Sequence, residues 1–326
     1  MRVNASISMK KHQRAIAVSL AVALAASLAA GSSISADASV DATSKASVAE
    51  AYRNVLVPAL AVPVSWNGTA DSCDAGAISA EAQTATLAAV NYMRELSGLS
   101  KVTFNPTYNA KAQKAALVYT ANNDLSHDIP SSWKCYSSDA AAAGERSNIA
   151  YGDGIAGPLA VLGYMEDPGA YNDVAGHRRW VLYPNAKTMG SGSTDIAQVL
   201  YVQGATSKKT KNPAWVEWPT AGYFPQQLEP NGRWSLTANA AWKWSFSKAK
   251  VSVKTASGKS LPVKVESRND QGYGNDTIVF KVSGVKKASG AGVALYTVKV
   301  SGIKKAGSSK AVSYSYKVKM FDAARD

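Results

Sequence analysis

The chain has 326 residues with a formal net charge of +13, and 46% of its residues are hydrophobic. This length is more than one hydrophobic core usually serves, so it argues against a single domain and for two. The charge is uneven, because residues 39–229 carry 14 Lys and Arg against 17 Asp and Glu, whereas residues 230–326 carry 18 against 5. This break indicates two bodies with different partners.

Residues 1–38 have the features of a secretory signal peptide. A basic stretch at residues 9–14 precedes 16 small and apolar residues, and Ala36-Asp37-Ala38 supplies an A-x-A cleavage signature. The apolar run is short for a membrane span of about 20 residues, although a retained anchor helix is the alternative. No second long apolar stretch follows. We therefore expect a secreted, extracellular protein with no transmembrane segment after cleavage.

The next two regions differ in pattern. Residues 39–75 are rich in Ala, Ser and Val and are expected to form a linker or N-terminal extension. Residues 76–229 are expected to form the first domain, where apolar spacing and capping residues predict helices at 79–98, from 105 to the stretch NNDLSHD, and at 157–166. The stretches TMGSGST and AQVLYVQG, after Pro184, are typical of strands, with Gly and Ser allowing close backbone approach.

Residues 230–326 alternate apolar and polar side chains, with turns between the runs. This period is typical of half-buried antiparallel strands and predicts a basic all-β domain, an Ig-like β-sandwich. The related stretches VSGVKKASG and VSGIKKAGS are too close together to be independent modules, so we interpret them as two similar strand–turn units.

Two cysteines, Cys73 and Cys135, remain in a chain expected to leave the cell. One disulfide between them is the simple interpretation, with two free thiols as the less favoured alternative. No base accompanies either cysteine in the stretches CDAG and KCYSS, which argues against a catalytic thiol.

The chain has three histidines, and His12 lies in the expected signal peptide. The other two, His127 and His177, occur in the same region as Glu145 and Glu166. Two imidazoles and two carboxylates are a candidate site for a divalent metal such as zinc. The same four side chains are also a candidate acid–base set.

The order of short motifs in residues 80–225 resembles the CAP superfamily, which comprises cysteine-rich secretory, antigen 5 and pathogenesis-related proteins, and more specifically its bacterial secreted branch. The matching elements are Asn91, Arg94, Gly98 and Leu99, then His127, GERSNIA, GYME, GHRRW and MGSG. The resemblance implies an α-β-α sandwich with both histidines and two acids in one cleft.

Two positions depart from the family pattern. Arg146 and Ser147 separate Glu145 from Asn148, where the family motif has Glu and Asn adjacent, so either an insertion moves Glu145 or Ser147 takes its place. Gly163 stands where the family has an aromatic residue. Asp167 and Asp173 are candidate substitute acids.

Three functional hypotheses follow. The first is a secreted binding protein whose cleft holds a lipid, a peptide or a metal. The second is a metal-dependent extracellular hydrolase or peptidase that uses His127 and His177; the chain has no HExxH and no Gly-rich phosphate loop. The third, compatible with both, is attachment of residues 230–326 to an anionic cell-wall polymer, with solubility as the plain alternative for their lysines. The compartment argues against nucleic acid as the polyanion.

Overall fold

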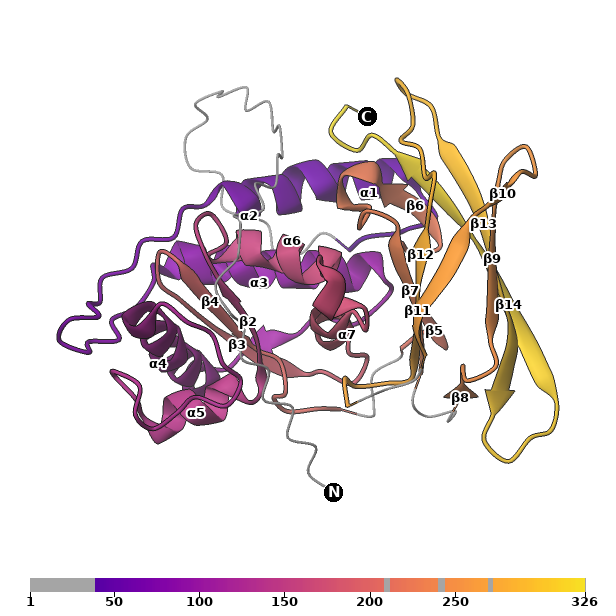
Figure 1. The fold of residues 1–326 in the computed structure, drawn as a ribbon. Coiled ribbons are helices and arrows are strands. Elements are labelled where there is room, and N and C mark those ends of the chain that lie inside the picture. The colour runs from indigo at the N-terminus through magenta and orange to yellow at the C-terminus, as the bar shows by residue number, and fades with distance from the viewer. Residues whose placement is uncertain (1–38, 208–211, 240–243, 269–271, 326) are drawn as a thin grey trace. The chain divides into compact units, whose positions relative to one another are not determined.

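The computed structural model of the chain describes residues 39–207, 212–239, 244–268 and 272–325 (Figure 1). The expected signal peptide lies outside the described residues. Within those residues, no helix has the length and apolar character needed to cross a membrane.

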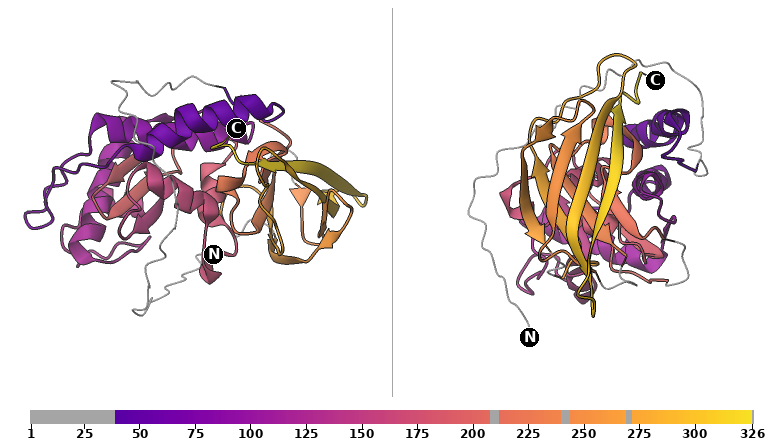
Figure 2. Two further views of the ribbon diagram at one scale, coloured as in Figure 1. Left: turned by 90° about the horizontal axis from the view of Figure 1, so that it is seen from above. Right: turned by 90° about the vertical axis from the view of Figure 1, so that its right-hand side faces the viewer.

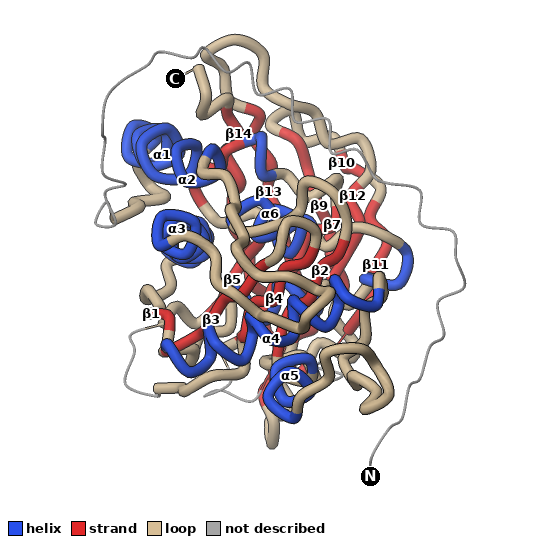
Figure 3. Tube along the Cα trace, turned by 90° about the vertical axis from the view of Figure 1, so that its left-hand side faces the viewer, coloured by secondary structure: helices blue, strands red, loops and turns tan. Residues whose placement is uncertain are grey.

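Residues 39–207 form layers of helices on both faces of a four-stranded sheet (Figure 3). The sheet has the order β1-β3-β4-β2, in which only the β1–β3 pair is parallel. Its strands are β1 (Thr103–Phe104), β2 (Ser147–Tyr151), β3 (Thr188–Ser193) and β4 (Ala197–Tyr201). Alternate residues of β4 belong to different cores, Leu200 to one and Val199 to the other. The expected α-β-α arrangement is therefore confirmed.

The helices of this region begin and end at the signals in the sequence. Ser79 caps α3 (Ala80–Leu96), and Asn105 caps α4 (Pro106–Asn122), whose first residue is proline. The other helices are α5 (Ser138–Gly144), α6 (Pro158–Glu166) and α7 (Gly176–Val181), with a short 3-10 turn η2 (Ala170–Asn172). Sequence reasoning predicted α3, α4 and α6 but not α5 or α7, which are too short to show a helical period.

Helix α4 lies directly on β3 because that strand is rich in glycine. A Cβ on Gly192 would come within 2.2 Å of the Gln113 backbone nitrogen. The Gln113 amide instead exchanges hydrogen bonds with the Ser193 backbone, donating at 2.7 Å and accepting at 3.1 Å. The close backbone approach expected for this strand is therefore confirmed.

Residues 45–61, expected to be part of a linker, are helical. They form α1 (Lys45–Ala51), the π-helical segment η1 (Tyr52–Leu56) and α2 (Val57–Ala61), with Ser44 as N-cap. Val48, Leu56 and Ala59 are fully buried in the main core. This packing favours the N-terminal extension over the linker, because small residues and a proline, Pro58 in the first turn of α2, are as compatible with a packed helix as with a spacer.

Residues 212–325 form two sheets, which confirms the expected β region (Figure 2). A six-stranded sheet has the order β10-β9-β13-β14-β6 with β8 beside β13, and a four-stranded sheet has the order β11-β12-β7-β5. The strands are β5 (Trp215–Trp218), β6 (Gly222–Pro225), β7 (Arg233–Ala238), β8 (Trp244–Ser245), β9 (Lys250–Thr255), β10 (Ser260–Leu261), β11 (Val263–Arg268), β12 (Thr277–Val282), β13 (Ala294–Lys305) and β14 (Ala311–Phe321), and the turn η3 (Gln226–Leu228) follows β6. The Ig-like assignment stays a prediction.

One core joins the helices to these sheets. It contains Leu56 and Met93 from helices together with Trp218, Trp234 and Phe280 from strands. Strands β5 and β6, which precede residue 230, pair with β7 and β14, which follow it. The proposed boundary between residues 229 and 230 stays a prediction, but the described residues pack as one compact unit.

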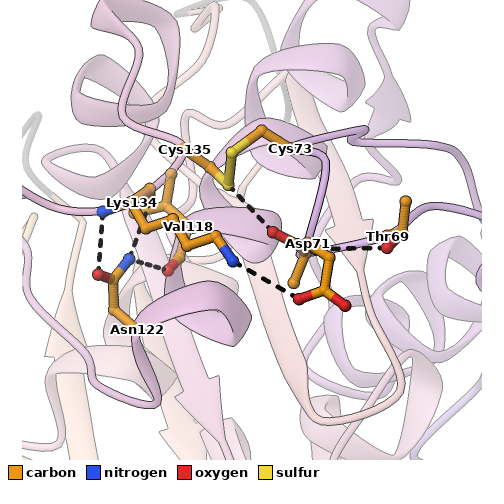
Figure 4. Close-up of a disulfide and its surroundings, with 8 residues drawn as sticks. Thr69, Asp71, Cys73, Val118, Asn122, Lys134 and Cys135 are labelled. Atoms are coloured by element: carbon orange, nitrogen blue, oxygen red, sulfur yellow. Dashed lines mark hydrogen bonds and ion pairs between the residues drawn. A yellow bond between two sulfur atoms is a disulfide. The ribbon is translucent and has the colours of Figure 1, made fainter.

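The disulfide expected between Cys73 and Cys135 is present (Figure 4). It ties the loop before α3 to the segment before α5, across 62 residues of chain. Beside it, Lys134 lies 3.6 Å from the Asp71 carboxylate, and its backbone nitrogen donates to the Asn122 side chain at 3.0 Å. The bond therefore fixes two segments that have little regular structure of their own.

Candidate functional site

A pocket of about 230 Å³ contains both described histidines. Its wall is formed by the segment after α4, by β2, by the chain around η2 and α7, and by the loop between β11 and β12. The lining residues are His127, Glu145, Ser147, Asn148, Tyr171, Asn172, Val174, Gly176, His177, Trp180, Gln203, Gly272 and Tyr273. Both histidines therefore line one pocket, and their role in a functional cleft stays a prediction.

His177 is oriented by a buried carboxylate. Its Nδ1 lies 2.8 Å from Oδ1 of Asp167, and its ring stacks on Tyr164 with centroids 5.4 Å apart. Burial alone would lower the pKa of His177, but the charge and hydrogen bond of Asp167 outweigh it, so the pKa is raised. With Nδ1 held by Asp167, Nε2 is the ring nitrogen left for a ligand.

His127 is oriented by the backbone. Its Nδ1 lies 2.8 Å from the carbonyl oxygen of Gly144, at the end of α5. Loss of hydration lowers the pKa of His127, and the nearby His177 lowers it further, although the bond to Gly144 opposes both. The imidazole is therefore neutral at pH 7, and its Nε2 is the nitrogen left for a ligand, as in His177.

Of the two acids in the motifs, Glu145 lines the pocket and Glu166 does not. Glu145 is exposed and Ser147 is buried, and both line the pocket. Which of them takes the place of the family's glutamate stays a prediction. Glu166 does not line the pocket, because its carboxylate accepts a hydrogen bond from Asn231. Asp167, the fully buried residue that ends α6 in the left-handed conformation, contacts His177 instead.

The correction for Glu166 has a simple cause. A helix that ends at residue 166 with a left-handed residue at 167 changes the direction of the chain at that point. As a result, the Asp167 side chain points inward to His177, whereas the Glu166 side chain points to Asn231. Asp173, the other candidate substitute, is exposed and does not line the pocket.

Buried arginine holds α7, the helix that carries His177. Arg178 is 1% exposed and donates to the carbonyl oxygens of Met165 at 2.6 Å, Glu166 at 2.9 Å and Arg233 at 2.8 Å. Burial lowers the pKa of Arg178 to about 10, so the guanidinium is charged at neutral pH. The RR of GHRRW, which the sequence shows only as two charges, is thus part of the support of the site.

Part of the pocket wall comes from the loop between β11 and β12, far along the sequence. Tyr273 lies against Gly176, where a Cβ would come within 2.8 Å of the tyrosine ring. Arg179 lies 5.7 Å from the centroid of the same ring and donates to the Asn275 carbonyl oxygen at 2.9 Å. Sequence reasoning did not find Tyr273; the only signal is an aromatic residue between two glycines in the stretch QGYGND.

The two imidazoles suit two of the ligands of a zinc ion. In metal-bound histidines the second ring nitrogen is held by a carboxylate or a backbone carbonyl, as it is in both residues here. However, no group of three or more His, Cys, Asp and Glu side chains in the described part of the chain could hold a metal ion. These residues do not fit a metal held by the protein alone, and the zinc site stays a prediction.

Comparison with known proteins agrees with the motif order. Residues 87–203 match the model of the cysteine-rich secretory protein family, CAP. No curated protein and no solved structure matches the chain. The matched range contains both histidines, the four strands β1 to β4 and the four helices α4 to α7. The chain therefore contains a domain of the CAP superfamily.

Proposed function

We propose that the protein is an extracellular binding protein whose pocket holds a short peptide against His127 and His177. A CAP domain and a disulfide indicate an extracellular protein of the interaction type. The ligand class is our inference from the pocket itself.

The composition and size of the pocket favour a peptide over a lipid. Its wall includes the side-chain amides of Asn148, Asn172 and Gln203. The amide nitrogens of Asn148 and Asn172 already donate to the carbonyl oxygens of His177 and Pro168, so these two side chains offer chiefly an acceptor to a peptide backbone, and Gln203 offers both a donor and an acceptor. A volume of about 230 Å³ is below the range of most drug-sized sites and suits one side chain or a chain terminus. Tyr171, 85% exposed at the pocket, offers an aromatic surface to the rest of the ligand.

The observation that carries the proposal is the way the two rings are held. Each Nδ1 has an oxygen partner, at 2.8 Å in both cases, and each ring belongs to the wall of the same pocket. Rings fixed in this way lose little conformational freedom when a ligand binds, which favours affinity. Two histidines that only filled the hydrophobic core would not be expected to line the same pocket.

The test uses the imidazole signals in nuclear magnetic resonance spectra. Free tripeptides of defined sequence are titrated into the protein, and the expected result is a saturable shift of both the His127 and the His177 signals by the same peptides. Asp167→Asn should weaken binding about tenfold, because the hydrogen bond that orients His177 loses its charge. Asn tolerates the left-handed backbone at this position, so the variant is expected to fold.

Asp173→Asn is the matched control, since it makes the same chemical change at an exposed acid outside the pocket. It should bind as the wild type does. The proposal is wrong if no peptide shifts either signal, or if both variants lose affinity equally.

A second candidate is a hydrolase, and the Asp167–His177 pair favours it. A carboxylate that orients an imidazole is the arrangement of a general base. Among the described residues, however, no hydroxyl or thiol is hydrogen-bonded to the His177 ring, and no cysteine is free. A fluorogenic peptide assay, with and without added zinc, separates the candidates: turnover that disappears in His177→Ala favours the hydrolase, and its absence favours binding alone.

A further inference from the structure

The outer face of the six-stranded sheet collects lysines that are far apart in the sequence. Strand pairing places Lys254 of β9 beside Thr297 of β13, and Thr297 beside Lys317 of β14. Two residues further along β13, Lys299 lies between Ser252 and Ser315. Lysines and hydroxyl groups therefore alternate across three adjacent strands.

The alternate residues of these strands show that this face points outward. Val253 and Val298 are buried under the sheet, whereas Lys254, Lys299 and Lys317 are exposed. Figure 2, right, shows the sheet with no described helix lying over it. None of the described outward residues of β9, β13 and β14 is acidic. The outward residues of the paired stretches 250–254, 294–301 and 314–320, here called the lysine face, are Lys250, Ser252, Lys254, Leu295, Thr297, Lys299, Ser301, Ser315, Lys317 and Lys319.

The lysines of this face have no carboxylate to balance them. No described carboxylate is within ion-pair distance of Lys254, Lys299 or Lys317. Lys299 is a diagonal neighbour of both other lysines, at a distance of about 7–8 Å in an antiparallel sheet. Such a cluster repels itself and attracts anions.

Protection of strand edges does not account for this arrangement. Lysines that prevent aggregation are expected on edge strands. In the order β10-β9-β13-β14-β6, however, β13 and β14 are interior strands, and Lys299 lies on β13. The lysines at turns, such as Lys286 and Lys287, remain compatible with a role in solubility.

The chemistry of the lysine face selects among polyanions. A single-stranded nucleic acid is usually held by exposed aromatic side chains on which bases stack. No exposed outward residue of β9, β13 or β14 is aromatic, since Phe321 is fully buried. Tyr223 of β6, whose ring centroid lies 4.6 Å from Lys319 Nζ, is half-buried at the margin of the face. A membrane surface would favour protruding apolar side chains, and Leu295 is the one aliphatic residue of the face. A flexible polymer of phosphodiesters and polyols fits best, because lysines bind phosphates and Ser and Thr hydroxyls bind polyol oxygens.

We propose that the lysine face binds a polyol-phosphate polymer, such as the anionic polymers of a cell wall. This binding is separate from the pocket of His127 and His177 and does not depend on what that pocket holds. Contacts with phosphates by point charges make the binding independent of any monomer sequence and sensitive to salt.

The test compares two triple variants with the same change in charge. Lys254→Gln/Lys299→Gln/Lys317→Gln removes three charges from the lysine face. The control, Lys286→Gln/Lys287→Gln/Lys310→Gln, removes three charges from exposed loop positions of the same region. Both are surface changes and should leave the unfolding temperature unaltered. The probe is immobilised poly(glycerol phosphate), with binding measured over a series of salt concentrations.

The wild type should bind the polymer, and the face variant should bind at least tenfold more weakly. The slope of log K against log salt should fall by about 2 for three lost phosphate contacts. The control should stay within about threefold of the wild type. Equal losses in both variants would show that only net charge matters and would overturn the proposal.

Two further probes decide the partner. Double-stranded DNA and vesicles of phosphatidylglycerol are offered to the wild type under the same conditions. Binding to the polymer above both supports the proposal. Failure to bind the polymer, or preference for DNA or vesicles, overturns it.

Discussion

Three arginines of residues 39–229 and three lysines of residues 230–326 use positive charge in opposite ways. In the first region, Arg94, Arg178 and Arg179 are at most 4% exposed and donate to backbone carbonyl oxygens. In the second, Lys254, Lys299 and Lys317 are exposed and without a described carboxylate partner. Guanidinium groups with several directed donors stabilise a fold, whereas ammonium groups on a sheet surface stay available to a partner. Net charge alone would not show this difference.

The largest effect is expected where the two regions meet. Arg178→Met should destabilise the protein by about 3–5 kcal/mol, because several buried carbonyl oxygens of α6 and β7 lose their donor at once. Chemical denaturation measures the loss. Arg325→Met is the control: that side chain is 76% exposed, and its loss should change stability by no more than about 0.5 kcal/mol.

Removal of the disulfide tests whether the two regions unfold together. Cys73→Ala/Cys135→Ala should cost about 2–4 kcal/mol, since the unfolded chain regains the freedom of a 62-residue loop. Because one core joins helices and sheets, the whole molecule should unfold in a single transition at a lower temperature. The interpretation would be contradicted if calorimetry showed two unfolding transitions and only one of them occurred at a lower temperature in the variant than in the wild type.

A smaller effect is expected at the contact between α7 and the loop after β11. Gly176→Ala should cost about 1–3 kcal/mol, because the new methyl group would meet the Tyr273 ring at 2.8 Å. The imidazole signal of His177 should shift as the pocket wall moves. Gly163→Ala is the control, since nothing lies within 4 Å of a Cβ there. An unchanged His177 signal in Gly176→Ala would count against the role of Tyr273.

The smallest expected effect concerns a buried acid in the β region. Burial raises the pKa of Glu217, against the opposing hydrogen bond from Tyr314. The folded protein then holds a proton that the unfolded chain releases, so stability falls as pH rises from about 4.5 through the raised pKa. Glu217→Gln should remove this fall and be slightly more stable than the wild type at pH 7. Unfolding curves between pH 4 and pH 8 check it, and an unchanged pH dependence would contradict it.

Local signals made part of the molecule predictable. Capping residues and apolar spacing predicted α3, α4 and α6. The resemblance of the motif order to the CAP superfamily implied that His127 and His177 lie close together, and both line one pocket. The remaining features of the fold and of the site depend on tertiary contacts, which cannot be inferred from a local sequence pattern. Glu166 and Asp167 are adjacent, and only the backbone conformation at the end of α6 decides which one faces His177. Tyr273 reaches the pocket through tertiary packing, and residues 45–61 are helical because the core receives one face of them.

The N-terminal helices have a consequence for the order of folding. Arg53 donates to the carbonyl oxygen of Ala323, 270 residues later, and Tyr223 donates to Ala42 at 2.7 Å. During synthesis, the N-terminal segment therefore completes these two contacts only after β6 and β14 have been made. Such distant pairings slow folding, because the N-terminal segment cannot complete its packing until the last strands exist.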